Sequence, residues 1–312
     1  MDLPLWLLTD IRMRLEVLAI ICLINFLSLL PIEVASTIPG KLLRWFAPFS
    51  NRHKRARKNL IAIFPYCTVQ QREALLRHMW ENMGRVFGEL PFLSQIASNP
   101  NRMHIENIEG IRVILKKNKG VIAVSGHFGN WELGAAPSFL LDQPQLSIYR
   151  EINNPYVDKY LKRYREKICP TGLLPKGNHS LKTAVRALRQ GYVLGMLIDQ
   201  RHSQGLTVPF LDRPAETTHA PALLAYRRNT PIVAAVIIRT QGVRFKMMWR
   251  EISYKKTGNS KEDIKAITVA INRQLECWVL QYPEQWLWSH SRWKRRKQRE
   301  KKQATAAVPT EA

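Results

Sequence analysis

The stretch VIAVSGHFGNWELG (121–134) places a histidine and a glutamate where a buried strand turns into a helix. His127 and Glu132 are five residues apart, which on a regular helix corresponds to about 140° of rotation, so they do not share one helical face. The two side chains meet only if His127 lies in the loop and Glu132 lies on the first helical turn. Gly126 and Gly129 permit the tight backbone that such a loop requires.

A histidine beside a carboxylate can remove a proton from a hydroxyl group. A carboxylate bound to one imidazole nitrogen fixes the tautomer and raises the basicity of the other nitrogen. Asn130 is a candidate helix cap, and free N–H groups at a helix start can stabilise the oxyanion of a carbonyl under attack. The arrangement suits acyl transfer from a thioester to an alcohol. The alternative is a capped turn whose polar residues satisfy local hydrogen bonds.

The spacing of the two residues has little specificity by itself. HIENIE (104–109) repeats it with His104 and Glu109. That stretch alternates polar and apolar residues like an edge strand, and the sequence suggests neither a glycine loop nor a helix behind it. We therefore interpret it as a surface pair, and the strand–loop–helix context singles out His127 and Glu132.

Two periodicities divide the chain. Residues 1–97 are predicted to be helical, and the segment 68–93 opens with a Thr cap. From about residue 103, strand-like runs alternate with amphipathic helices, which is typical of a largely parallel sheet covered on both faces. The runs are GVIAVS, LSIYR, YVLGMLI, PIVAAVII and VRFKMMW.

We therefore predict an α/β fold with a mostly parallel sheet flanked by helices and a helical N-terminal portion that anchors to a membrane. The anchor region is expected at 1–40. One domain is expected at 41–295, with residues 41–97 helical and 103–295 forming the α/β core. A basic polar tail, predicted to be disordered, follows at 296–312.

The basis for the anchor is the apolar run VLAIICLINFLSLLPI (17–32). It is shorter than the ~20 apolar residues of a spanning helix, so it predicts a membrane anchor that either spans or lies deep in the interface. A buried core helix is the alternative. If the run spans, the cluster of Lys and Arg from Lys41 to Lys58 places its C-terminal side in the cytoplasm.

The formal net charge is +24, from 48 Lys and Arg against 24 Asp and Glu, which indicates an anionic partner. A basic nucleic-acid-binding protein explains this charge but leaves the apolar run and the glycine-flanked pair unexplained. The four cysteines are far apart and have no zinc spacing, as is typical of a reducing compartment. No Walker loop, H-E-x-x-H or dinucleotide motif is present, so no metal or nucleotide cofactor is expected.

SGHFGNWELG resembles a block of the lysophospholipid acyltransferase superfamily, specifically of its lipid A late acyltransferase branch. The N-terminal apolar segment and ARKNLIAIFP (56–65) also fit, and further blocks follow in the same order. They are IYREINNPYVDKYLKRYRE (148–166), GYVLGMLIDQ (191–200), LTVPFLDRPAETTHAPALLA (206–225) and PEQWLWSHSRWK (283–294).

This resemblance implies transfer of a fatty acyl chain from an acyl carrier protein to a hydroxyacyl chain of a phosphorylated glucosamine disaccharide. The partners are then the carrier protein, an anionic glycolipid and the membrane, with no nucleic acid. The reaction takes place at the cytoplasmic face of the bacterial inner membrane and needs no cofactor. Coenzyme A is the alternative donor. Phosphatidylinositol mannosides and lysophospholipids are the alternative acceptors.

The resemblance also assigns roles to residues. His127 is the general base and Glu132 its partner, while Arg150 or Arg165 contacts the acceptor phosphate or the oxyanion. Asp199 ends an apolar strand and either caps the next loop or supports the site. The full set expected on the substrate side is Arg150, Arg165, Asp199, Gly129 and Asn130.

The chain departs from the family pattern at two dipeptides. The family usually has Phe-Gly where this chain has Leu211-Asp212, and Thr-Gly where it has His219-Ala220. Glycerolipid members usually carry Asp at the Glu132 position and a later Phe-Pro-Glu-Gly block, which this chain lacks. The pattern therefore favours the lipid A branch.

Overall fold

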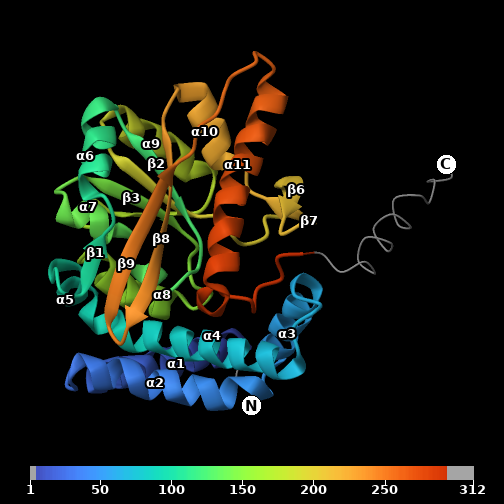
Figure 1. Cartoon of the computed structure of the whole chain (residues 1–312). Helices are drawn as coiled ribbons and strands as arrows, with labels where there is room; N and C mark the ends of the chain where they lie inside the picture. Colours follow the sequence, from blue (N-terminus) through green and yellow to red (C-terminus); the bar gives the residue numbers. More distant parts are fainter. Residues whose placement is uncertain (1–4, 294–312) are drawn as a thin grey trace, which may run out of the picture.

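The computed structural model describes residues 5–293 (Figure 1), so the predicted tail at 296–312 lies outside the described residues. The first third is helical, as predicted. Its elements are α1 (Leu5–Ser28), α2 (Ile32–Phe46), η1 (Ala47–Phe49), α3 (Asn51–Ile63), α4 (Val69–Glu89), η2 (Leu90–Phe92) and α5 (Leu93–Ser98).

Helix α4 joins this helical layer to the rest of the molecule. The Thr68 side chain accepts a hydrogen bond from the Gln71 N–H, and the Gln71 side chain accepts one from the Thr68 N–H, which forms a capping box. On the face toward α2, a Cβ on Gly88 would lie 2.0 Å from the Ala35 carbonyl oxygen. Only glycine lets the two helices approach this closely.

Seven strands form one sheet in the order β1-β9-β8-β2-β5-β3-β4. The last five in this order run parallel, β9 runs antiparallel to β8, and β1 runs parallel to β9. The mostly parallel sheet is therefore confirmed. The strands are β1 (Met103–Ile105), β2 (Val121–Ser125), β3 (Gln145–Tyr149), β4 (Leu173–Pro175), β5 (Val193–Leu197), β8 (Ile232–Gln241) and β9 (Arg244–Glu251); β6 (Leu206–Phe210) and β7 (Arg213–Thr217) form a separate hairpin.

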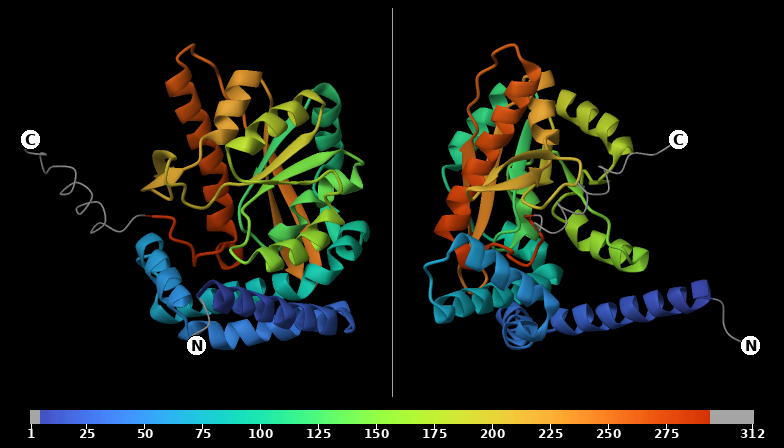
Figure 2. Two further views of the ribbon diagram at one scale, coloured as in Figure 1. Left: turned by 180° about the vertical axis from the view of Figure 1, so that it is seen from behind. Right: turned by 90° about the vertical axis from the view of Figure 1, so that its right-hand side faces the viewer.

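Helices cover both faces of the sheet (Figures 1 and 2). Ile122 and Leu194 face a large core with α9 (Asn178–Arg189), α10 (Ala220–Arg228) and α11 (Ser260–Gln281). Val121 and Val193 face the opposite way, toward α6 (Ile108–Lys117). Helices α7 (Ala136–Leu140) and α8 (Pro155–Glu166) belong to a second core with α5.

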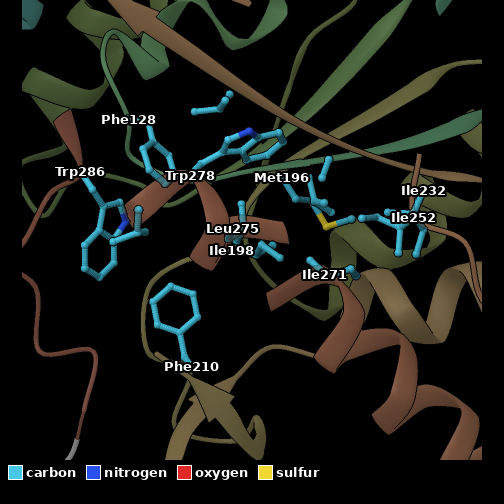
Figure 3. Packing of buried hydrophobic residues seen from close by; sticks show 14 of the residues in the cluster. Phe128, Met196, Ile198, Phe210, Ile232, Ile252, Ile271, Leu275, Trp278 and Trp286 are labelled. Carbon is cyan, nitrogen blue, oxygen red and sulfur yellow. The ribbon is translucent and has the colours of Figure 1, made fainter. Parts of the chain in front are cut away.

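Aromatic side chains hold the C-terminal segment against the sheet (Figure 3). Trp286, which follows η4 (Pro283–Gln285), is 2% exposed and packs on Phe210 with ring centroids 5.7 Å apart. Phe128, in the loop after β2, is fully buried in the same cluster. Its main chain forms an isolated antiparallel β-bridge with that of Trp286. The loop that carries His127 is therefore fixed by packing on a distant segment.

Of the two forms predicted for the anchor, a spanning helix is not found among the described residues. No helix within residues 5–293 is both long and apolar enough to cross a membrane. Helix α1 has 24 residues, but Asp10, Arg12, Arg14 and Glu16 occupy its first half. Ionised side chains are costly in a bilayer core, so only the second half of α1 has the composition of an anchor.

Helix α1 lies against α8 through polar contacts. Tyr156 accepts a hydrogen bond from Arg14 at 3.0 Å and donates one to Asp10 at 2.7 Å. Asn154, which caps α8, donates to the Met13 carbonyl at 2.9 Å. The charged half of α1 is therefore attached to the helix that carries Arg165.

The second His–Glu pair of the sequence lies on two elements. His104 is exposed on the edge strand β1, whereas Glu109 is on the first turn of α6 and binds Arg112 at 3.3 Å. The expectation that no helix follows this stretch is therefore wrong, because Asn107 caps α6 through the Gly110 N–H. The edge-strand position and surface location of His104 agree with the sequence interpretation.

Candidate active site

The loop after β2 presents His127 at the carboxyl edge of the sheet. Gly129 has φ +46°, and a Cβ at this position would lie 2.1 Å from the Ile237 carbonyl oxygen. The Gly129 carbonyl also accepts a hydrogen bond from Asn82 of α4 at 2.8 Å. These contacts press the loop onto β8 and α4, while the His127 side chain remains 17% exposed.

His127 is hydrogen bonded to Asp199, which lies just beyond β5. Its ring Nδ1 is 2.8 Å from Asp199 Oδ1, and its main-chain N–H donates to Oδ2, also at 2.8 Å. Trp286 Nε1 donates to Oδ2 at 2.8 Å. Asp199 is 3% exposed, so the carboxylate is enclosed and acts on the histidine.

The two side chains shift one another's ionisation. Burial opposes the charge on Asp199, but the charge of His127 and the donated hydrogen bonds outweigh it and lower the pKa of Asp199 to about 2. Burial also disfavours a protonated ring, yet the carboxylate of Asp199 and, more weakly, that of Glu132 raise the pKa of His127. An ionised Asp199 accepts a hydrogen bond from Nδ1–H, which leaves Nε2 with its lone pair as the basic atom.

Gln200 and Trp131, which line the cavity together with His127, lie against the imidazole ring. Gln200 Nε2 lies 3.3 Å from His127 Nε2, and the Trp131 ring centroid lies 5.3 Å from that of His127. A basic nitrogen in this setting can take a proton from a hydroxyl that enters the cavity.

Glu132 binds Arg165 and not His127. Arg165 Nε and Nη2 donate to the two carboxylate oxygens of Glu132 at 2.6 and 2.8 Å, a bidentate ion pair. The two side chains are 11% and 20% exposed. The expectation that Glu132 orients the imidazole is therefore corrected: Asp199 is the hydrogen-bonded carboxylate, and Glu132 acts on His127 only through its charge.

The Asn130 side chain links the turn that carries Glu132 to the buried Glu89 of α4. Its Oδ1 accepts the Glu132 N–H at 3.1 Å, and its Nδ2 donates to Glu89 at 2.8 Å. Glu89 is completely buried and is paired with Arg239. The predicted cap is confirmed, but the capping residue is enclosed.

A cavity of about 850 Å³ opens in front of His127. His127, Glu132, Arg150 and Arg165 line it, whereas Gly129, Asn130 and Asp199 lie behind its wall. The Gly129 main chain and the Asn130 and Asp199 side chains are engaged with the protein, and contact of these three residues with substrate stays a prediction. Most of the remaining wall is apolar and follows one face of the sheet beneath α6, with Ile111, Ile114, Val121, Ala123, Val193 and Val233.

A model of the family described as bacterial lipid A biosynthesis acyltransferase matches residues 8–295. The chain belongs to this family. The acyltransferase is 24% identical over 273 residues to the lipid A biosynthesis palmitoleoyltransferase of Escherichia coli K12, covering 86% of this chain and 87% of the relative. It is 26% identical over 265 residues to the lauroyltransferase of the same strain, covering 82% and 83%. A lipid A biosynthesis acyltransferase of Haemophilus influenzae is 24% identical over 274 residues, covering 84% and 82%.

Family membership decides between the two classes that the sequence left open. The acyltransferase is an enzyme that acts in lipid A biosynthesis, and the alternative of a basic nucleic-acid-binding protein does not describe it. The resemblance seen in the sequence is thereby confirmed. The cavity, with its basic histidine and apolar wall, is the candidate active site of this enzyme.

Proposed function

We propose that the acyltransferase moves a fatty acyl chain from an acyl carrier protein thioester to a hydroxyl group of a lipid A precursor, with His127 as general base. The observation that carries this proposal is the hydrogen bond from Nδ1 of His127, a cavity-lining residue, to the buried Asp199 at 2.8 Å, which leaves Nε2 as the basic nitrogen. Asp199 is the positioning residue and replaces Glu132 in that role.

In this mechanism His127 Nε2 takes the proton of the acceptor hydroxyl as its oxygen attacks the thioester carbonyl. The new C–O bond forms an oxyanion, which collapses as the C–S bond breaks. The imidazolium then gives its proton to the departing thiolate. The Asp199 carboxylate stabilises the imidazolium between the two proton transfers, in keeping with the raised pKa of His127.

Arg165 is our candidate for the residue that stabilises the oxyanion. It lines the cavity together with His127, and Glu132 fixes its guanidinium through Nε and Nη2. Within residues 5–293, Nη1 has no hydrogen-bond acceptor and is left to bind a developing negative charge. Arg150 lies further along the rim and is our candidate contact for the acceptor phosphate.

The apolar part of the cavity suits the acyl chain. It extends along β2 from His127 to Val121, and the four residue steps of the strand alone span about 13 Å. Aliphatic side chains from two other strands and α6 close around it. A chain held in this space keeps water away from the thioester.

We further propose that the acyltransferase docks on the inner membrane at its cytoplasmic face, without a spanning helix. Figures 1 and 2 place α1 and α2 in one layer at the base of the molecule. Both helices expose large apolar side chains, among them Trp6, Leu15, Phe26, Leu42 and Trp45. The exposed cations Arg52, Lys54 and Lys58 of α3 favour an anionic lipid surface.

The test is acyl transfer in vitro with purified enzyme and a lipid A precursor, followed by mass spectrometry of the product. The carrier-protein thioester and the coenzyme A thioester of the same acyl chain are compared at equal concentration. We expect one added acyl chain per acceptor and a higher kcat/KM with the carrier protein. Equal or better use of coenzyme A would overturn the assigned donor, and acylation of only a lysophospholipid would overturn the acceptor.

A further inference from the structure

A group of basic side chains lines the cavity away from His127 and has no part in the proton transfers described above. We propose that Arg150, Lys176, His202 and His219 form an anion site that holds a phosphate ester of a substrate at a distance from the reacting hydroxyl. This inference rests on the proposed function and extends it, because it adds three residues to Arg150 and fixes where the phosphate lies.

The topology of the sheet brings Arg150 and Lys176 to the same edge as His127. Arg150 directly follows β3 and Lys176 directly follows β4, and the Lys176 N–H donates to the Tyr149 carbonyl at 2.8 Å. In the order β2-β5-β3-β4, the ends of β3 and β4 are two and three strands from the end of β2. At a strand spacing of about 4.8 Å, Arg150 lies about 10 Å and Lys176 about 14 Å from the His127 position along the edge.

The two histidines reach the same part of the cavity from another direction. His202 lies in the connection that follows β5, and its N–H donates to the Glu216 carbonyl of β7 at 3.0 Å. His219 lies just beyond β7 and precedes α10. This contact between the connection and the hairpin explains why both rings line the cavity wall beside Lys176.

The positive charge at this end of the cavity is not balanced by acids. Within residues 5–293, Arg150 and Lys176 form no ion pair with a carboxylate, whereas the nearby Arg201 binds Glu216 at 2.7 Å. Burial and the charge of Arg150 lower the pKa of Lys176. Burial, Lys176 and His219 lower the pKa of His202. Mutual repulsion of this kind is relieved when an anion binds between the groups.

Unsatisfied ring atoms point to the same conclusion. Within residues 5–293, the Nδ1 atoms of His202 and His219 are buried and have no hydrogen-bond partner, and the same holds for His290, which also lines the cavity. Buried polar atoms are nearly always paired in folded proteins, so unpaired nitrogens on rings that line one cavity favour a partner that binds beside these rings. Helix α9 begins directly after Gly177, no described side chain caps it, and its first turn has no acid, which adds to the positive potential beside Lys176.

Two cations and two imidazoles suit a phosphate ester better than a carboxylate, because a phosphate offers more acceptor oxygens and more charge. Both proposed substrates contain such a group: the acceptor carries sugar phosphates, and the carrier-protein donor carries a phosphodiester on its prosthetic arm. The site is therefore defined by the phosphate group that both substrates share. Kinetics with each phosphate removed in turn shows which substrate places its phosphate there.

The experiment compares wild-type enzyme with Lys176→Met and His219→Thr, the latter restoring the residue usual in the family. Lys162→Met is the matched control, because Lys162 lies on α8 outside the cavity and binds Glu166 at 3.5 Å. The acceptor is used with and without one sugar phosphate, and the donor is the carrier-protein thioester or a short thioester that lacks phosphate. We expect Lys176→Met to raise the KM of one substrate roughly tenfold, the scale of one charged hydrogen bond, with little change in kcat.

The penalty should disappear when the phosphate is removed from the substrate that the site binds. Loss of the penalty with the shortened acceptor assigns the site to the acceptor, and its loss with the short thioester assigns it to the donor. An unchanged KM in both variants would overturn the site. So would a rise in KM that persists both with the acceptor that lacks a sugar phosphate and with the short thioester.

A binding measurement separates this result from failure of the proposed function. Calorimetric titration with inorganic pyrophosphate should show binding to His127→Ala and weaker or no binding to the Lys176→Met/His219→Thr double variant. Arg150→Met serves as an independent variant if the double variant does not fold. Pyrophosphate binding that is equal in all of these proteins contradicts the site, whatever reaction the enzyme catalyses.

Discussion

Asp199 accepts two hydrogen bonds from His127, one from ring Nδ1 and one from the main-chain N–H, each at 2.8 Å. The carboxylate therefore fixes both the backbone and the imidazole ring of His127. Trp286 holds the same carboxylate from the C-terminal segment. The orientation of the base thus depends on the neighbouring strand and not on the helical turn that follows His127.

Glu132 and Arg165 should behave as one unit. Each group loses its bidentate partner when the other is removed, so Glu132→Ala and Arg165→Ala should each lower kcat/KM at least about tenfold, and the double variant should be little worse than either. Arg165→Lys should not restore activity, because an ammonium cannot reproduce the bidentate geometry. If steady-state kinetics show that the losses of kcat/KM in the two single variants add in full in the double variant, Glu132 and Arg165 do not act as one unit.

The pH profile of kcat/KM should report His127. The base must be neutral to accept a proton, so activity should fall as the pH drops through the raised pKa of His127, with an inflection above the ordinary value of about 6.5. Glu132→Gln removes a negative charge that raises this pKa, and the inflection should therefore move to lower pH. An inflection below the ordinary value, or one that Glu132→Gln moves upward, contradicts this electrostatic account.

Two glycines that follow His127, Gly129 and Gly134, should respond differently to substitution by alanine. At Gly129 a Cβ would lie 2.1 Å from the Ile237 carbonyl, and φ is +46°, so Gly129→Ala should cost roughly 1–3 kcal/mol of stability or more. Gly134 has open space within 4 Å and lies in the helical turn, so Gly134→Ala should be neutral or stabilise by up to about 1 kcal/mol. Thermal unfolding compares the pair, and equal shifts in Tm would contradict the packing of the turn.

Membrane docking should depend on the exposed face of α2. Leu42→Glu places a charge among its apolar side chains and should weaken sedimentation with anionic vesicles. Leu280→Glu on α11 is the matched control, because Leu42 and Leu280 are 52% and 54% exposed. Binding of the wild-type protein should also weaken as salt rises. If both variants bind vesicles as well as the wild type, the docking face has been assigned to the wrong helix.

Most of the sheet was predictable because its central strands are short apolar runs between turn signals. GVIAVS, YVLGMLI and PIVAAVII each correspond to a strand of the parallel core. The N-terminal anchor was harder to predict. The apolar run shows how long the apolar segment is, but it does not show which of its side chains a neighbouring helix will cover. In α1, Ile24 and Leu27 are buried against the protein, while Leu23 and Phe26 remain exposed.

The position of His127 was predictable and its partner was not. Glycines on both sides of the histidine mark the loop within a few residues of sequence. Asp199 lies 72 residues away and meets His127 only because β5 is hydrogen bonded next to β2. Its place at the end of an apolar strand was the available signal. The order of strands in a parallel sheet cannot be read from one sequence, so the sequence alone favours Glu132, which is close to His127 along the chain.

We propose that Asp199, and not Glu132, orients His127 as the catalytic base. The most direct measurement is the acyl-transfer rate of Asp199→Asn beside Glu132→Gln and His127→Ala, in proteins whose Tm matches the wild type. We predict that Asp199→Asn lowers kcat by about 10³–10⁴, close to the loss in His127→Ala, because an amide donates to Nδ1 and selects the wrong tautomer. Glu132→Gln should lose much less. A near-normal rate for Asp199→Asn together with a Glu132→Gln rate as low as that of His127→Ala would contradict the account.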